Sequence, residues 1–193
     1  MQASVRSPST RSAINGLTLI ELVVVIAIVA VLIAAALPRM TALQRQARIG
    51  HLNSTRGAVY MSATMVHAAL VTRAEQPDVM PCPAGGAPGD NRLVGVGTLC
   101  TEHGLVKTRN GYPASTALAA GLPGIVGAAG IGTLFDPSAE QLRAEGYLVD
   151  VAGPVTTFSR ADASMPSLCK FTYTEPPAAR TAATVSAPVV SGC

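Results

Sequence analysis

Large aromatic side chains are scarce in this chain of 193 residues. Tryptophan is absent, and phenylalanine and tyrosine together make up only 4% of the sequence. The apolar fraction of 49% is misleading, because one long apolar run and many alanines supply much of it. Residues 73–193 contain six of the aromatic side chains, which indicates one compact domain whose core has few large side chains.

Charge is also sparse, and neither sign dominates. Without Arg6 and Arg11 near the amino terminus, twelve basic side chains stand against eleven acidic ones. Proteins that bind nucleic acid carry a basic stripe, whereas here only Arg45, Arg48 and Arg56 form a local basic patch. The sequence therefore argues against nucleic acid as a partner.

Charge is almost missing from one segment, residues 17–37. These 21 residues span roughly 31 Å as a helix, which matches the hydrocarbon core of a bilayer, and Glu21 alone interrupts them. A carboxylate in lipid costs about 2.5 to 3.5 kcal/mol, so it normally has a cationic partner or a task. We predict a transmembrane helix in which Glu21 needs a cation; the alternative is that Glu21 only reaches the headgroups.

Signatures of catalysis are missing as well. Asp136, Glu140 and Glu145 cluster in sequence, but Ser138 in front of Glu140 and Leu142 predicts a capped short helix with a solvated face. The glycines of residues 121–132 are not followed by the Gly-Lys-Ser/Thr of a phosphate-binding loop, so we expect a flexible loop there. His51 and His67 have no acid or cysteine at helical spacing. We expect no enzyme activity and no cofactor.

The four cysteines are Cys82, Cys100, Cys169 and Cys193, an even number that indicates an oxidising compartment. Three pairings are possible, and we favour Cys82 with Cys100 and Cys169 with Cys193 because each closes a modest loop. Zinc bound by Cys82, Cys100 and His103 is the alternative, but these residues lack a close thiolate pair and a fourth ligand. We therefore expect disulfides and no metal.

A long helix should continue beyond the membrane segment. Apolar residues recur on one helical face, at steps of seven, four, three and four, namely Leu52, Val59, Ala63, Val66 and Leu70. One helix over residues 17–72 would be roughly 84 Å long, with Pro38, Gly50 and Gly57 as weak points.

After residue 72 a loop rich in Pro and Gly precedes several short extended segments. They are separated by turn residues such as Asn110-Gly111 and predict an antiparallel sheet packed on the helix. The predicted strands are residues 92–96, 105–108, 147–151, 155–159, 168–174 and 184–190. Residues 114–132 are either partly helical or a long ordered loop. The fold class is α+β, with a long amino-terminal helix on a small antiparallel sheet.

The start of the chain resembles the type IV prepilin family at Gly16, Leu17 and Glu21. The polar leader, residues 1–16, has no apolar core of its own, so any cleavage precedes the apolar run. The resemblance implies that a membrane-embedded prepilin peptidase cuts after Gly16 and that Leu17 is methylated. It also implies that the Glu21 carboxylate pairs with the terminal amine of a neighbouring subunit. Leu17 in place of phenylalanine and Asn15 in place of a basic residue predict slower cleavage.

The resemblance also divides the chain into a leader (1–16), a helix (17–72, membrane-spanning over 17–37) and a disulfide-stapled head (73–193). Cys169 and Cys193 match the disulfide-bounded loop of type IV pilins. Three short stretches look most like pilins of the mannose-sensitive haemagglutinin type: residues 52–59, residues 110–113 and residues 169–174.

The implied function is a structural subunit that polymerises through its helix into a surface fibre for adhesion or motility. Its implied partners are further copies of the chain, the pilus assembly machinery and, before assembly, the inner membrane of a Gram-negative bacterium with the head in the periplasm. The alternatives are a pseudopilin of type II secretion and a membrane-tethered monomeric binding domain. Four arginines follow the span and two precede it, and this balance favours a cytoplasmic C-terminal side. We follow the leader motif instead, which requires a cytoplasmic amino terminus.

Overall fold

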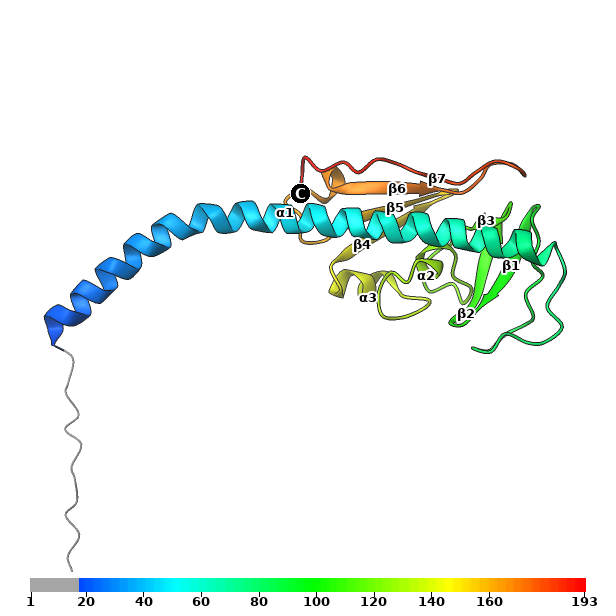
Figure 1. The fold of residues 1–193 in the computed structure, drawn as a ribbon, viewed down its shortest axis with the longest axis horizontal. Coiled ribbons are helices and arrows are strands. Elements are labelled where there is room, and N and C mark those ends of the chain that lie inside the picture. The colour runs from blue at the N-terminus through cyan, green and yellow to red at the C-terminus, as the bar shows by residue number, and fades with distance from the viewer. Residues whose placement is uncertain (1–17) are drawn as a thin grey trace, which may run out of the picture. The chain divides into compact units, whose positions relative to one another are not determined.

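The computed structural model describes residues 18–193, which fall into two compact units divided between Leu43 and Gln44. One helix, α1 (Leu19–Arg73), contributes to both units. The second part of α1 therefore belongs to the same unit as the strands, which we call the head unit (Figure 1). The α+β class predicted from the sequence is confirmed.

Helix α1 begins with a side-chain cap. The Glu21 backbone N–H donates to the Thr18 hydroxyl at 3.3 Å, and Glu21 itself lies in the first turn, where a negative charge is favourable. The helix continues through residue 38, Gly50 and Gly57, so the three expected weak points do not break it. In the described residues, α1 is the one helix long and apolar enough to cross a membrane, and none of its apolar window is buried.

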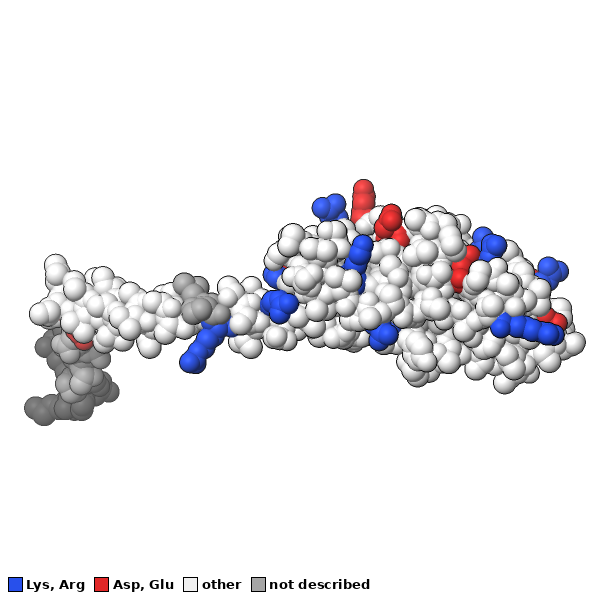
Figure 2. All heavy atoms as spheres, turned by 90° about the horizontal axis from the view of Figure 1, so that it is seen from above, with Lys and Arg blue, Asp and Glu red and all other residues white. Residues whose placement is uncertain are grey.

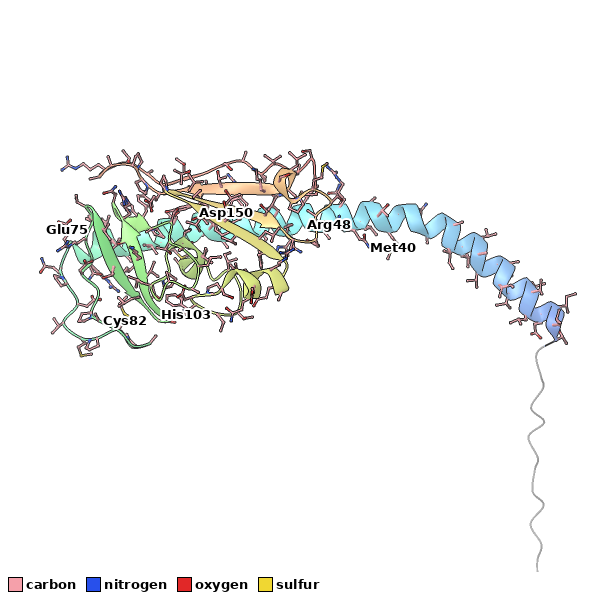
Figure 3. All side chains as sticks on the ribbon, turned by 180° about the vertical axis from the view of Figure 1, so that it is seen from behind. Met40, Arg48, Glu75, Cys82, His103 and Asp150 are labelled. Atoms are coloured by element: carbon pink, nitrogen blue, oxygen red, sulfur yellow. A yellow bond between two sulfur atoms is a disulfide. The ribbon has the colours of Figure 1, made fainter. Side chains whose placement is uncertain are left out.

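In the head unit, α1 supplies one face of the core, as its period predicts. The five apolar residues of that face are at most 6% exposed, namely Leu52, Val59, Ala63, Val66 and Leu70. Figure 1 shows this part of α1 crossing in front of the strands, and Figure 3, seen from behind, shows the strands in front of it. The helix thus covers one side of the head unit.

Two antiparallel sheets pack on α1, whereas the sequence predicted a single one. The first sheet has the order β1-β2-β3, and the second has the order β4-β5-β6-β7. Their strands are β1 (Val96–Thr101), β2 (Gly104–Arg109), β3 (Tyr112–Pro113), β4 (Tyr147–Ala152), β5 (Val155–Arg160), β6 (Lys170–Thr174) and β7 (Thr184–Val185). The sheets are separate because residues 114–146 intervene with a loop and two short helices.

The two sheets cover successive parts of α1. Leu52 and Val59 pack in one cluster with the paired rings of Phe158 and Phe171, which belong to the four-stranded sheet. Leu70, near the end of the helix, packs instead against Leu99 of β1. The core therefore consists of two clusters along the helix. Such a core needs few aromatic side chains.

Several predicted strand limits were wrong. Of the predicted strand 92–96 only Val96 is in a strand, because residues 93–95 form a bend in which Gly95 has φ +73° and pairing begins at Val96. The predicted strand 168–174 starts at Lys170, after a 3₁₀ turn at Pro166–Leu168. The predicted strand 184–190 ends at Val185, and pairing with β6 resumes only as an isolated bridge between Lys170 and Val189. The Asn110-Gly111 turn is confirmed, with both residues at positive φ.

Residues 114–146 form a close-packed connection rather than a flexible loop. It contains α2 (Ile125–Ala128) and α3 (Ala139–Ala144), and Ser138 with Gln141 forms the capping box of α3. A Cβ on Gly124 would lie 1.8 Å from the Ala114 carbonyl oxygen, so only glycine fits there. Close packing explains Gly124 and Gly127, whereas Gly121 and Gly130 meet open space and have positive φ.

Candidate functional site

The first part of α1, residues 19–36, is the most unusual surface in the described chain. Its mean hydropathy reaches 3.1 over an 18-residue window, and its large apolar side chains are 45% to 81% exposed. Glu21 is the one charge on it. Such a surface is stable only when lipid or other protein covers it.

The Glu21 carboxylate has no cation within ion-pair distance among residues 18–193. Gly16 and Leu17, the predicted sites of cleavage and methylation, lie outside the described residues. Any cation for Glu21 must therefore come from the first 17 residues of the chain or from another molecule. An unpaired carboxylate in an apolar surface is costly, so a cation from either source would stabilise Glu21.

Two disulfides staple the head unit in the sequence-adjacent pairing. Cys82 joins Cys100 across 18 residues and Cys169 joins Cys193 across 24 residues. Cys82, Cys169 and Cys193 are at most 4% exposed. Within residues 18–193 no group of His, Cys, Asp and Glu could hold a metal ion, and the His103 ring faces the Phe135 ring with centroids 6.3 Å apart.

Three arginines of α1 hold the C-terminal tail, residues 186–193. Arg45 donates to the Val190 carbonyl at 3.3 Å, Arg48 to the Cys193 carbonyl at 3.0 Å, and Arg56 to the Ser186 carbonyl at 2.7 Å. The sequence suggested only a basic patch. The spacing of the arginines in the sequence could not indicate this role, because the acceptors are backbone carbonyls at least 130 residues away.

The same tail also pairs with the four-stranded sheet and with the turn before it. Lys170 and Val189 exchange two backbone hydrogen bonds, of 3.0 and 2.8 Å, and the Gly192 N–H donates to the Leu168 carbonyl at 2.9 Å. Together with the Cys169–Cys193 disulfide, these contacts fix the tail between β6 and α1. The tail is an integral edge of the head unit.

The histidines occupy structural positions. His67 stacks on Tyr112 with ring centroids 4.2 Å apart, and its Nδ1 lies 2.9 Å from the Gly111 carbonyl oxygen. His51 lies among Tyr147, Arg160 and Thr55 at 3.3 to 3.4 Å. Each ring joins α1 to a strand or turn of the head, and neither has a carboxylate partner that would orient it as a catalytic base.

The clustered carboxylates likewise serve local structure. Asp136 accepts from the Gly121 N–H at 2.7 Å, and Glu145 accepts from the Thr133 N–H and hydroxyl. Glu175, only 7% exposed, pairs with Arg109 at 3.3 Å and accepts from the Ser115 N–H. These carboxylates connect loops and do not converge on a common point.

Beside Glu175, Tyr173 is fully buried and donates its hydroxyl to the Pro113 carbonyl at 2.6 Å, which ties β6 to β3. Burial, and then the nearby Glu175 carboxylate, raise the pKa of the Tyr173 phenol far above its ordinary value of 10.0. The phenol therefore stays protonated in the folded head and acts as a hydrogen-bond donor between the two sheets.

An open groove of about 720 Å³ lies beside the end of α1, lined by Arg73, Val79 and Met80 among others. Arg73 is already engaged there, because it donates to Asp78 and to the Asn91 side chain. Figure 2 shows the charged side chains scattered over the visible face of the head unit rather than gathered into one basic surface. The groove offers no assembled set of reactive groups.

Comparison with known families identifies the amino-terminal segment. Residues 11–37 match the prokaryotic N-terminal methylation motif, which is the type IV prepilin cleavage and methylation signal. The match includes Gly16, Leu17 and Glu21. No curated protein and no solved structure matches the chain, so the mannose-sensitive haemagglutinin type is not confirmed. The motif, the apolar helix and the antiparallel head together support a type IV pilin-like or pseudopilin-like protein.

Proposed function

We propose that this protein is a structural subunit of a type IV pilus, which polymerises through α1 into a surface fibre for adhesion or motility. One observation carries the proposal: the apolar first part of α1 is uncovered on every side and contains a carboxylate without a cation among the described residues. A bilayer can cover the apolar surface, but it brings no protein cation to Glu21. Further copies of the chain supply both.

The proposed sequence of events begins in the inner membrane of a Gram-negative bacterium, with the head in the periplasm. Prepilin peptidase cuts the leader, residues 1–16, after Gly16, and Leu17 becomes the methylated first residue. Its amine then pairs with Glu21 of a neighbouring copy, which sets the register as the assembly machinery extracts the subunit. The fibre contacts its target with the head unit, which contains the predicted head, residues 73–193.

The two disulfides agree with this route, because such bonds persist in the periplasm and outside the cell. The arginines after the span also have a structural role that does not depend on the orientation of the helix in the membrane. Three of the four, Arg45, Arg48 and Arg56, hold the C-terminal tail once the head has folded. Their number after the span therefore has a structural cause.

The test is Glu21→Ala, with Glu21→Asp as the charge-preserving control. In native cells we expect normal membrane insertion of the Ala variant but at least a tenfold loss of sheared surface fibre, because the amine loses its partner. The Asp variant should recover part of the yield. Full fibre yield from Glu21→Ala would contradict the proposed register.

A pseudopilin would share the same motif, but its processed chain would be found in a different cell fraction from that of a pilus subunit. Intact mass and N-terminal sequencing of sheared fibres and of membranes decide between the two. Processed chain that starts at methylated Leu17 and is abundant in fibres supports a pilus subunit, whereas processed chain confined to membranes supports the secretion pseudopilin. Chain that keeps Met1 in both fractions contradicts a filament of either kind.

A further inference from the structure

A second hollow of the head unit, of about 440 Å³, lies between α1 and the end of β5. It contains two guanidinium groups, those of Arg48 on α1 (Figure 3) and of Arg160 on β5. Asp162, on the turn after β5, is the one carboxylate among the described residues that line it. Six residues form this arginine pocket, namely Gln44, Ala47, Arg48, His51, Arg160 and Asp162. With two fixed cations against one carboxylate, the arginine pocket has a positive charge.

Arg160 is held in place by groups other than Asp162. Its side chain is only 12% exposed, and its Nη1 donates to the His51 Nδ1 at 3.3 Å. Its guanidinium group also lies over the Tyr147 ring, 5.7 Å from the ring centre, which is within cation–π range. The positive charge of the arginine pocket is therefore positioned in advance by the folded head unit, which lowers the cost of binding an anion.

Asp162 satisfies the two arginines unequally. Its Oδ1 lies 2.9 Å from Nε and 2.8 Å from Nη2 of Arg160, whereas its Oδ2 lies 3.6 Å from Arg48 Nε, too far for a hydrogen bond. Arg48 uses its Nη1 for the Cys193 carbonyl. Its Nε and Nη2 have no hydrogen-bond acceptor within residues 18–193. Two donors of a planar fork thus remain free beside a second guanidinium group.

We propose that the arginine pocket binds the phosphate group of a phospholipid headgroup. The arginine fork matches two oxygens of a phosphate group, and the hydrogen bonds gain strength because both partners are charged. A phosphate diester has two unesterified oxygens that share one negative charge. That charge equals the surplus in the arginine pocket, two arginines against one aspartate. Arg48 would donate to the phosphate through Nε and Nη2, and Arg160 would add the second positive charge.

The position of the arginine pocket in the chain favours a lipid as the source of the phosphate. Gln44 follows the apolar stretch, residues 19–36, after only eight residues of the same helix. Phosphate groups lie just outside the hydrocarbon core that such a stretch spans, so they are the anions most concentrated beside the residues that follow it. The inference rests on the proposed membrane-inserted subunit. It adds that the head unit contacts lipid headgroups before the subunit is extracted.

Native mass spectrometry of the full-length protein measures this contact, with equal amounts of phosphatidylglycerol and phosphatidylcholine in the detergent. Both lipids have the phosphate diester, but choline cancels its charge. Wild type should therefore retain about ten times more phosphatidylglycerol. Arg48→Gln should lower this preference to about twofold, because it removes one of the two cations.

Arg56→Gln is the matched control. Arg56 lies on the same helix and also donates to a tail carbonyl, but it does not line the arginine pocket. The Arg56→Gln variant should keep the wild-type preference for phosphatidylglycerol. An unchanged preference in Arg48→Gln, or an equal loss in both variants, would overturn the proposal.

Asp162→Asn changes the charge in the opposite direction. It removes the competing carboxylate from an exposed turn and leaves Arg160 held by His51 and Tyr147. The preference for phosphatidylglycerol should rise by about threefold, and a value at or below that of wild type would contradict the proposal.

Excess inorganic phosphate distinguishes the two sources of the phosphate group. It should displace less than half of the bound phosphatidylglycerol, because the lipid is also held by its chains. Complete displacement would identify free phosphate as the ligand and overturn the lipid assignment. Absence of any lipid preference in wild type would reject the arginine pocket and leave the pilus proposal intact. A wild-type chain that forms no surface fibre would reject the pilus proposal itself.

Discussion

The two parts of α1 have the same backbone and opposite environments. Residues 19–36 are exposed and apolar except for Glu21, whereas residues 44–73 bury one face, hold the tail through arginine hydrogen bonds and leave the opposite face exposed. A single helix can therefore belong to a membrane or fibre at one end and to a folded core at the other. The difference is set by which side chains repeat at helical spacing, because the backbone hydrogen bonds are the same in both parts.

The largest expected difference between the two parts is in the stability of the head. Leu52→Ala, in the buried face, should lower the free energy of unfolding by about 3 to 5 kcal/mol, because it removes packed methyl groups and leaves a cavity. Leu32→Ala, at a site 64% exposed in the first part, should leave it unchanged within about 0.5 kcal/mol. Thermal unfolding of full-length protein in detergent, followed by near-ultraviolet circular dichroism, measures both. Equal effects would mean that the head does not fold independently of the first part.

The next contrast concerns how the two ends of the head are stapled. Cys169→Ser with Cys193→Ser opens a loop of 24 residues and should cost roughly 3.5 kcal/mol in the chain-entropy account. It should also expose the amides of residues 189–193 to rapid hydrogen exchange. Cys82→Ser with Cys100→Ser is the matched control, with a similar cost and an unchanged tail. Continued protection of the tail in the first variant would show that the arginines and the β6 pairing suffice to hold it.

Alkaline pH should lower the stability of the head through Tyr173, which has no counterpart in the first part of α1. The pKa of Tyr173 is raised on folding, so its contribution to stability is complete below about pH 10 and is lost as the pH rises above that value. The slope from this residue is about 1.4 kcal/mol per pH unit. Tyr173→Phe should be less stable by about 1 kcal/mol at pH 8 and should lose less stability above pH 10. Parallel curves for the two proteins, recorded by urea unfolding, would exclude Tyr173 as the titrating group.

The smallest expected effect is that of one tail arginine. Arg56→Met keeps the apolar stem but removes the donor to the Ser186 carbonyl, which should cost about 0.5 to 1.5 kcal/mol because the bond is partly exposed to water. Arg143→Met, on the short helix α3, should change stability by less than about 0.5 kcal/mol. Hydrogen exchange near residue 186 is the sensitive readout. Unchanged hydrogen exchange near residue 186 in Arg56→Met would show that Arg56 does not hold the tail.

Much of this organisation could be predicted from local pattern. The apolar run, the core face from Leu52 to Leu70, the Asn110-Gly111 turn and the cap at Ser138 each depend on residues within a few turns of one another. The two disulfides follow the pairing that closes the shorter loops. In each case the physical cause, periodicity or a side chain that bonds its own neighbourhood, is present in the sequence itself.

Other features could not be predicted because their partners are distant. The sequence showed the arginines of α1 as a patch, but their acceptors are carbonyls of residues 186–193. The division into two sheets depends on how residues 114–146 pack around Gly124 and Gly127. Residues 92–96 have strand composition, yet the positive φ at Gly95 delays the strand to Val96.

The sequence by itself determined the prepilin signal, the membrane-length apolar helix, the carboxylate at Glu21 and the α+β class. These properties are local, since a peptidase motif, a hydrophobic run and a helical period each act over a short stretch of chain. Only the tertiary structure decided that the tail is locked to α1 and that the two sheets share one helix. It also decided that one face of that helix stays uncovered, because exposure is what remains after every other segment has packed.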